Sequence, residues 1–536
     1  MIADFRFVRD EALPRGAVVV VGAGAAGMAV ALALGNAGRD VLLLESGADA
    51  APDLQDPLNE GTTGELPWSG LLAGRARALG GTTTLWHGQC MRLHPVDVEP
   101  RPWLPGSGWP LSLSELDEHY ETAERFLDVS GRGYDATRWD EHPDLPPLAW
   151  DATRLLHDFT EYTPKPSLAR TYRPQLAEHR HVTVVLGATA GAVLVEDGRV
   201  VGVQARGDGG RRTRIESSEV VLAAGAVENA RLLQLSDPEG IGLGLGREHT
   251  GRYLQDHPTI RTAEVHSRDF RVLQDRYIVL HAGPRRLFPK VRLAPGMQRE
   301  HQLVDATAVF VHEHDDPALG AARRLVLSAR RRQRPDRPVR DLATVVRGAA
   351  PVLRTAYRRR VRQLATGEPP SHVWLQLWLE QPPDPQRRVR LGEGLDALGL
   401  RRAHVDWTCG DQEIETSRRL TRWIGEDLDR LGIARLEELA PMHDDAAWRR
   451  AVTDAAHPAG TTRMSASPAD GVVDRDLQVH GVSGLHVVGG SVFPTSGYAN
   501  PTLTIVALSL RLAGHLLSGQ DRTGPDRPAR GGRPLG

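Results

Sequence analysis

The residues with the clearest chemical potential are a histidine and an asparagine in the last fifth of the chain. His457 precedes Pro-Ala-Gly-Thr-Thr, and Asn500 follows about forty residues later, directly before Pro501 and Thr502. A histidine can take the proton of a substrate hydroxyl, and an asparagine can donate a hydrogen bond to its oxygen. The apolar run 503–517 predicts a buried helix with Pro501 as its first residue, and the start of a helix favours negative charge. Together these features suit the oxidation of an alcohol by hydride transfer to a bound flavin, which becomes anionic on reduction.

A glycine-rich turn near the N-terminus predicts the nucleotide site that this chemistry needs. The expected elements are a strand over 17–21, a glycine turn, a helix over 28–38 and a strand over 40–45. This is the order of the dinucleotide-binding fold, in which the first glycine makes the tight turn, the second admits a pyrophosphate and the third lets the helix pack on the strand. The terminal acid would bind a ribose hydroxyl pair. The residues concerned are Gly22, Gly24, Ala26, Gly27 and Glu45.

The glycine motif alone does not decide between FAD and NAD as the nucleotide, and further motifs bear on this choice. They are Gly80-Gly81-Thr82-Thr83, the strand end that contains Ala224 and Gly225, the phrase Asp256-His257-Pro258, and 489–495 with Gly490 and Ser491. With these motifs the chain resembles the glucose–methanol–choline (GMC) oxidoreductases along nearly its whole length. The form Asn500-Pro501-Thr502 and the phrase 489–495 are most similar to those of pyranose oxidases and of sugar or polyol dehydrogenases.

The resemblance implies a role for each matching position. His457 corresponds to the catalytic histidine of the family and Asn500 to its partner. Gly81 and Thr82 would face the flavin ring, 489–491 would pass beneath it and Thr502 would contact its pyrimidine edge. Some relatives attach FAD covalently through a histidine where this chain has Leu85, so non-covalent FAD is expected. The implied cofactor-binding set adds Gly80, Gly81, Thr82, Thr83, Ala224, Gly225, Gly490, Ser491, Pro501 and Thr502.

Several of these residues also have a purely structural interpretation. His457 is one of 21 histidines. Asn500, before a proline, could cap the helix with its side chain. Glu45 could simply end a strand, and His257 is expected to be structural.

The length of 536 residues exceeds one ordinary core and favours two domains. We expect an α/β, Rossmann-like FAD-binding domain from 1–91, 182–257 and 457–518. It would be interleaved with an α+β substrate-binding domain built on an antiparallel sheet, from 92–181 and 258–456. The segment 519–536, rich in Gly, Pro and Arg, predicts a disordered tail.

The run 373–379 predicts a strand that could form a sheet floor over the flavin, with strands over 388–391 and 404–407 as its neighbours. Its tryptophans, Trp374 and Trp378, are candidates for stacking on a sugar face, and are equally suited to a core.

A basic segment, 323–365, does not fit a plain enzyme core. From Arg323 to Arg362 there are fourteen arginines against Asp336 and Asp341, a local charge of +12. Apolar residues at helical spacing predict two short amphipathic helices. A solvated arm, an oligomer contact, an active-site lid and a contact with a membrane or an acidic partner remain open.

Composition sets limits on partners. The net charge is −2, so no nucleic-acid partner is expected. Two cysteines, Cys90 and Cys409, are too few for a disulfide framework, and no metal site is expected. No apolar run approaches the ~20 residues that span a bilayer, and no signal core precedes the first strand. A cytoplasmic enzyme without membrane contact is expected.

The resemblance to sugar-oxidising relatives favours a secondary ring hydroxyl of a sugar or glycoside, oxidised at C2 or C3 to a ketone. A non-sugar alcohol, a polyol, a cyclitol and a non-redox lyase reaction stay open as alternatives. The electron acceptor could be oxygen, a quinone or a redox protein, and a homo-oligomer is possible.

Overall fold

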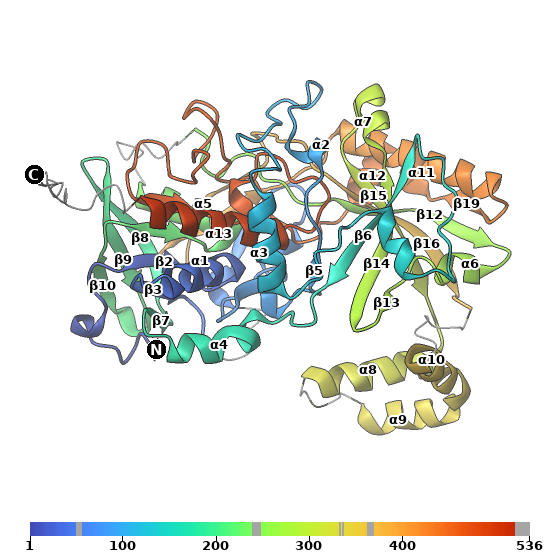
Figure 1. Cartoon of the computed structure of the whole chain (residues 1–536), viewed down its shortest axis with the longest axis horizontal. Helices are drawn as coiled ribbons and strands as arrows, with labels where there is room; N and C mark the ends of the chain where they lie inside the picture. Colours follow the sequence, from blue (N-terminus) through green and yellow to red (C-terminus); the bar gives the residue numbers. More distant parts are fainter. Residues whose placement is uncertain (50–55, 238–247, 332–333, 335–336, 362–368, 520–536) are drawn as a thin grey trace, which may run out of the picture.

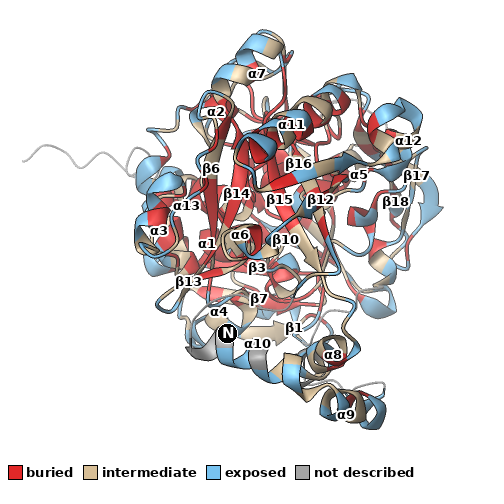
Figure 2. Ribbon diagram, turned by 90° about the vertical axis from the view of Figure 1, so that its right-hand side faces the viewer, coloured by how far each residue is buried: buried red, intermediate tan, exposed pale blue. Residues whose placement is uncertain are grey.

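The computed structural model describes residues 1–49, 56–237, 248–331, 334, 337–361 and 369–519. These residues form two large sheets side by side, one parallel and one antiparallel, with helices on their outer surfaces (Figure 1). Buried residues concentrate in the sheets and exposed ones on the outer helix faces (Figure 2). The two Cys residues, Cys90 and Cys409, are free and buried.

The first sheet is parallel throughout. Because helices cover both faces of such a sheet, its central strands are continuously apolar, as in Val18–Val21. Its strands, in spatial order, are β1 (Ile2–Asp4), β7 (Val182–Leu186), β3 (Val41–Glu45), β2 (Val18–Val21), β11 (Val220–Leu222) and β20 (Leu485–Val487).

The helices next to this sheet position the candidate site. Helix α1 (Ala25–Asn36) consists of small and apolar residues and packs against α13 (Thr502–Ser518), which in turn packs against α3 (Asp117–Leu127). Helix α13 begins one residue later than expected, because Pro501 is its N-cap. Helix α5 (Gly225–Ser236) follows β11 directly, and α4 (Leu168–Glu178) precedes β7.

The second sheet is antiparallel. Its strands, in order, are β19 (Ala434–Glu438), β12 (Thr259–Ser267), β16 (His372–Leu379), β15 (Ala306–Glu313), β14 (Arg285–Leu293), β6 (Leu155–Tyr162) and β5 (Gln89–Cys90), with β13 (Leu280–Ala282) beside β14. Strand β16 alternates, with one face buried and the face of Trp374, Gln376 and Trp378 half-buried. The helices of this part are α2 (Pro95–Val98), α6 (Phe270–Gln274), α7 (Pro295–His301), α11 (Asp411–Arg430) and α12 (Asp445–Ala451).

Two smaller sheets complete the fold. One joins β8 (Thr189–Glu196), β9 (Arg199–Arg206) and β10 (Arg212–Glu216). The other joins β17 (Arg388–Leu395), β18 (Arg401–Asp406) and β4 (Gly61–Thr63).

The expectation that strands 388–391 and 404–407 flank strand 373–379 is wrong. They pair with each other, and β16 lies between β12 and β15. Pro382, Pro383 and Pro385 follow β16, and prolines cannot donate the hydrogen bonds of a hairpin return, so the chain leaves this sheet.

The α/β fold class is confirmed, since a parallel sheet flanked by helices lies beside a separate antiparallel sheet, and blocks of their strands are interleaved along the chain. The domain boundaries stay a prediction. The expected tail lies, from residue 520, outside the described residues. In the described part of the chain, no helix is both long and apolar enough to cross a membrane.

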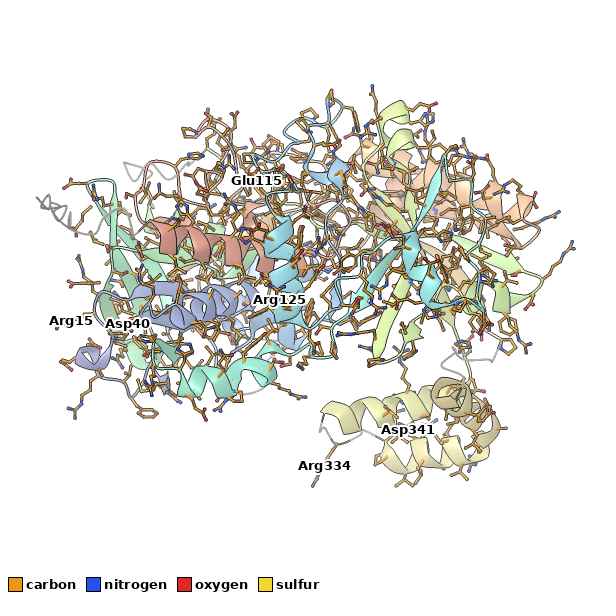
Figure 3. The ribbon with its side chains drawn as sticks, viewed as in Figure 1. Arg15, Asp40, Glu115, Arg125, Arg334 and Asp341 are labelled. Atoms are coloured by element: carbon orange, nitrogen blue, oxygen red, sulfur yellow. The ribbon has the colours of Figure 1, made fainter. Side chains whose placement is uncertain are left out.

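Three helices form an arm that contains the described part of the basic segment, namely α8 (Pro317–Arg331), α9 (Pro338–Arg347) and α10 (Ala349–Val361). The arm stands apart from both sheets (Figure 1). Asp341 of α9 points toward α8 (Figure 3) and pairs with Arg324 at 2.5 Å. The outer faces of α9 and α10 carry exposed apolar residues.

Candidate active site

The three glycines of the turn after β2 are needed for different steric reasons. A Cβ at Gly22, where φ is +101°, would lie 2.6 Å from the carbonyl oxygen of Ala223. A Cβ at Gly27 would lie 1.8 Å from the oxygen of Gly22. These two glycines therefore allow close packing of helix and strands. Gly24 has no protein atom within 4 Å of the position of a Cβ, and it opens into a cavity.

Glu45, at the end of β3, organises this turn with its carboxylate. Its Oε2 accepts a hydrogen bond from the Ala23 N–H at 2.9 Å, and its Oε1 accepts one from Gly47 at 2.8 Å. The side chain lines the cavity and is otherwise buried, and burial raises the pKa of the carboxyl group. Glu45 thus does more than end a strand.

Three further turns close around the same space. The 3₁₀ turn Gly81–Thr84 is tied to the glycine turn, because the Gly80 N–H donates to the Ala23 oxygen at 2.9 Å. Gly225, with φ of +84°, has no atom within 4 Å of a Cβ position. The Gly460 N–H donates to the Gly490 oxygen at 3.1 Å, which connects the segment after His457 to 489–491.

These turns enclose a cavity of about 620 Å³. Most residues expected to bind cofactor or substrate line it, namely Gly22, Gly24, Ala26, Glu45, Gly81, Thr82, Thr83, Ala224, Gly225, Trp378, His457, Gly490, Asn500, Pro501 and Thr502. Those that do not are Gly27, Gly80, Ser491 and Trp374.

The four residues off the cavity wall have structural contacts instead. Gly27 and Gly80 allow the close packing of the turns. Ser491 is buried and its Oγ accepts a hydrogen bond from Asn229 at 3.0 Å. Trp374 lies on the same face of β16 as Trp378 but four residues along, where its Nε1 donates to Glu313 at 2.7 Å.

His457 lies half-buried on the cavity wall. Its Nδ1 is 3.0 Å from Nδ1 of His257, a buried residue behind the wall. Burial, followed by the nearby charge of Lys290, lowers the pKa of His457 to about 4. Burial, with smaller contributions from His457 and Lys290, also lowers the pKa of His257 well below its usual value. Both rings are therefore neutral near pH 7, the state required of a base.

Asp256 holds the two histidines in place. Its Oδ1 accepts hydrogen bonds from the backbone N–H groups of His257 at 2.7 Å and of His457 at 2.9 Å. The indole of Trp68 donates to its Oδ2 at 3.0 Å. Burial, followed by the charge of Asp454, raises the pKa of Asp256 to about 7 against these hydrogen bonds, which favour the charged form.

Asn500 faces the cavity and contacts a lysine from behind. The Nζ of Lys290, on β14, donates to the Asn500 Oδ1 at 3.4 Å. The N-cap of α13 is Pro501, and Asn500 does not cap the helix with its side chain.

Sequence reasoning missed a pair of arginines on the cavity wall. Arg75 and Arg77 both pair with Glu228, at 2.6 and 3.1 Å, and Arg77 also donates to Ser46. Guanidinium groups recognise phosphate oxygens well. Their alternation just before Gly80 was the available signal, and only the fold shows that the two arginines line the same cavity as the glycine turn.

The site fits a dinucleotide. A side chain at Gly24 or Gly225 would fill space that no protein atom occupies, as expected where a ligand runs past the backbone. The cavity wall includes the Glu45 carboxylate, two arginines, the start of α13 and His457. These groups match a ribose, a pyrophosphate and a redox-active ring.

Comparison with known proteins identifies the family. Models described as GMC oxidoreductase match residues 154–259 and 383–509, and an NAD(P)-binding Rossmann-like domain matches 20–73. The chain is 25% identical to paromamine 6'-oxidase of Streptomyces fradiae over 94% of this chain and 92% of that protein. It is 27% identical to C-glycoside 3-oxidase of Microbacterium trichothecenolyticum over 82% and 75%.

The same fold occurs in the crystal structure of pyridoxine 4-oxidase from Mesorbium loti, with a TM-score of 0.54 and 18% identity over 94% of this chain and 99% of that one. The family models and the curated relatives identify an FAD-dependent oxidoreductase, and the cavity fits that cofactor. The chain belongs to the GMC oxidoreductase family, as the sequence indicated, and acts on an alcohol or a sugar.

Proposed function

We propose that this enzyme oxidises a secondary ring hydroxyl, at C2 or C3, of a sugar or glycoside to a ketone. The single observation that carries the proposal is the pair of His457 and Asn500 on the wall of the cavity that fits the cofactor. The relatives named paromamine 6'-oxidase and C-glycoside 3-oxidase support a glycoside among the alcohols that such a pair could serve.

The chain's own residues divide the work between them. FAD, when bound, supplies the two-electron oxidant that accepts hydride from the substrate carbon. His457 takes the hydroxyl proton, while the amide NH₂ of Asn500 donates to the oxygen as it becomes a carbonyl. Neutral His257 is a hydrogen-bond acceptor at Nδ1 when its single proton is on Nε2. His257 can then accept at Nδ1 from His457, which leaves Nε2 of His457 as the base.

Two finer points belong to the same proposal. We expect FAD to be dissociable, since Leu85 on the cavity wall is aliphatic and cannot form a covalent link. Heat-denatured protein should release its flavin into the supernatant, whereas pelleting of the flavin with the protein would contradict this. Oxygen, a quinone and a redox protein remain candidate acceptors, and the cytoplasmic location stays a prediction.

The proposal is tested anaerobically. Purified holoenzyme is mixed in turn with glucose, a plant glycoside, a cyclitol and a simple alcohol, and the visible band of oxidised flavin is followed. Bleaching by a sugar or glycoside supports the proposal, and product analysis then assigns C2 or C3. Bleaching only by the cyclitol or the alcohol would replace the substrate class, and no bleaching by any would favour a lyase. Admission of air after bleaching separates oxidase from dehydrogenase.

A further inference from the structure

Lys290 is a buried lysine directly behind the candidate active site. Of the 66 lysines and arginines in the chain only Lys165 and Lys290 are lysines. Lys165 is exposed and pairs with Asp128 at 3.0 Å, whereas Lys290 is fully buried on β14. The buried position 290 thus carries a compact ammonium group in a chain whose basic residues are almost all arginines.

The contacts of Lys290 lead to two cavity residues. Its Nζ donates to Asn500 Oδ1 at 3.4 Å and lies 4.4 Å from the centre of the Trp378 ring, within reach of a cation–π interaction. Asn500 and Trp378 line the cavity and Lys290 does not. The lysine can therefore influence a substrate only through these side chains or through its charge.

A carboxylate on the neighbouring strand balances this charge. Burial lowers the pKa of Lys290 to about 7, and the charge of Asp158, its register partner on β6, opposes this and favours the ammonium form. Asp158 also accepts from His94 at 2.8 Å and from the Tyr498 hydroxyl, and Arg292 lies 4.0 Å away. The Tyr498 ring is 5.6 Å from Nζ.

We propose that Lys290 is a positioning residue that holds the Asn500 amide with its NH₂ group toward the substrate oxygen. An ammonium group has only donors, so of the two ends of the amide it can bind only the oxygen. The NH₂ end is then left for the cavity, where a donor is needed. This inference rests on the role proposed for Asn500.

A double-mutant cycle tests the inference. Lys290→Met removes the donor at similar length and should slow anaerobic flavin reduction by about tenfold to a hundredfold, with little change in FAD affinity or visible spectrum. Asn500→Ala should also be slow. In the Asn500→Ala background, Lys290→Met should cost little more, because the lysine acts through Asn500. Lys165→Met is the matched control and should keep the wild-type rate.

Each contrary result has a distinct meaning. A wild-type rate in Lys290→Met, with Asn500→Ala slow, would overturn the positioning role and leave the proposed function intact. Multiplied losses in the double variant would show that Lys290 acts independently of Asn500, which also overturns it. A wild-type rate in Asn500→Ala would remove the proposed function and this inference together.

Two further readouts separate positioning from a structural effect. Because the lysine charge lowers the pKa of His457, Lys290→Met should move the acid limb of the reduction rate to higher pH. Lys290→Arg keeps a donor and should retain more of the rate than Lys290→Met does. If Lys290→Met fails to fold, Lys290→Leu, which also lacks a donor, replaces it in the cycle.

The strongly exposed apolar residues of the protein cluster on the arm. Six of the ten large apolar residues that are strongly exposed in the described chain lie on α8–α10, and Val339, Leu342 and Val346 share one face of α9. The segment 323–362 has a charge of +12 and the whole chain −2, so the remaining residues carry −14. Two arms repel each other, whereas an arm and the acidic body attract.

We infer that the arm docks on the body of a second copy of this chain. An apolar ridge flanked by arginines matches an acidic protein surface, and an anionic bilayer would attract the arm but repel the body. Reciprocal docking of two arms would give a closed dimer.

The mass of the holoenzyme in solution tests this. Sedimentation should show a dimer for the wild type and a monomer for Leu342→Glu with Val346→Glu. Leu395→Glu, on β17, alters a residue whose side chain is 58% exposed, the same fraction as Leu342, and should remain a dimer. A wild-type monomer, or a dimer that survives the double change, would overturn the inference. A monomer that floats with phosphatidylglycerol vesicles would assign the arm to lipid instead.

Discussion

Single residues around His457 decide its protonation state. The ring is half-buried on the cavity wall, stands 3.0 Å from another neutral histidine and lies near the ammonium group of Lys290. Burial and the nearby lysine charge both disfavour a second proton on the ring. The base is therefore available over a wide pH range, without a carboxylate partner of the kind that many catalytic histidines use.

This environment predicts the pH dependence of the reaction. His457 acts when neutral, so the rate of flavin reduction should be constant above its pKa and fall as pH drops through about 4. An ordinary histidine would place this limb near 6.5. Anaerobic stopped-flow measurements across pH, with the flavin spectrum as a control for intact protein, check the position of the limb. A limb near 6.5 would show that the ring is hydrated.

Removal of the imidazole tests the role itself. His457→Ala should slow flavin reduction about a hundredfold or more, as loss of a general base does, and leave FAD binding unchanged. His87→Ala is a useful control, because His87 also lines the cavity but has no role in the proposed chemistry. Full activity in His457→Ala would refute the mechanism.

At the scale of elements, the glycine turn before α1 both lets the helix pack on the strands and leaves room for the cofactor. One pair of variants can separate these two roles. A methyl group at Gly27 would meet the Gly22 oxygen at 1.8 Å, while one at Gly24 would meet no protein atom within 4 Å. The first glycine is needed by the fold and the second by the ligand.

Gly27→Ala should therefore destabilise the protein by about 1–3 kcal/mol or more, because helix and strand must move apart. Gly24→Ala should leave thermal unfolding of the apoprotein unchanged and weaken FAD binding by about tenfold, or ~1.4 kcal/mol. Thermal scans of apoprotein and flavin fluorescence titrations measure the two effects. Equal effects of both variants on FAD affinity and on Tm would mean that the turn does not face the cofactor.

At the scale of the whole molecule, Asp256 joins distant parts of the chain. Trp68 comes from the segment after the first strands, His257 precedes β12, and Ala455 and His457 precede the last part of the parallel sheet. All four donate to one buried carboxylate. The position of the base thus depends on the assembly of both sheets.

Asp256→Ala would leave these buried donors without an acceptor, and each costs about 1–3 kcal/mol. We expect a large loss of Tm and slow flavin reduction in any protein that folds. Asp256→Asn keeps an oxygen for the backbone donors but sets an NH₂ group against the Trp68 indole, so its loss should be smaller. Thermal unfolding of both variants checks this order. An unchanged Tm in Asp256→Ala would show that water replaces the carboxylate.

Local patterns in the sequence determined the elements of this protein and much of its site. The valine run, the spacing of Gly22, Gly24 and Gly27, and the acid Glu45 lie within thirty residues, and each has a local steric reason that survives in any context. The motifs around His457 and Asn500 are equally local, and they indicated the family. The apolar run 503–517 became α13 for the same reason.

Only the tertiary structure decided which side chains meet across long stretches of chain. Asp256 contacts Trp68, and Lys290 contacts Asn500, across about two hundred residues of sequence. No periodic pattern in the sequence predicts either contact. Trp374 and Trp378 share one face of a strand, yet about 13 Å of extended chain separates them, and only one meets the cavity. Strand pairing and burial depend on the packing of the whole molecule, so the electrostatics of the site could be read only after folding.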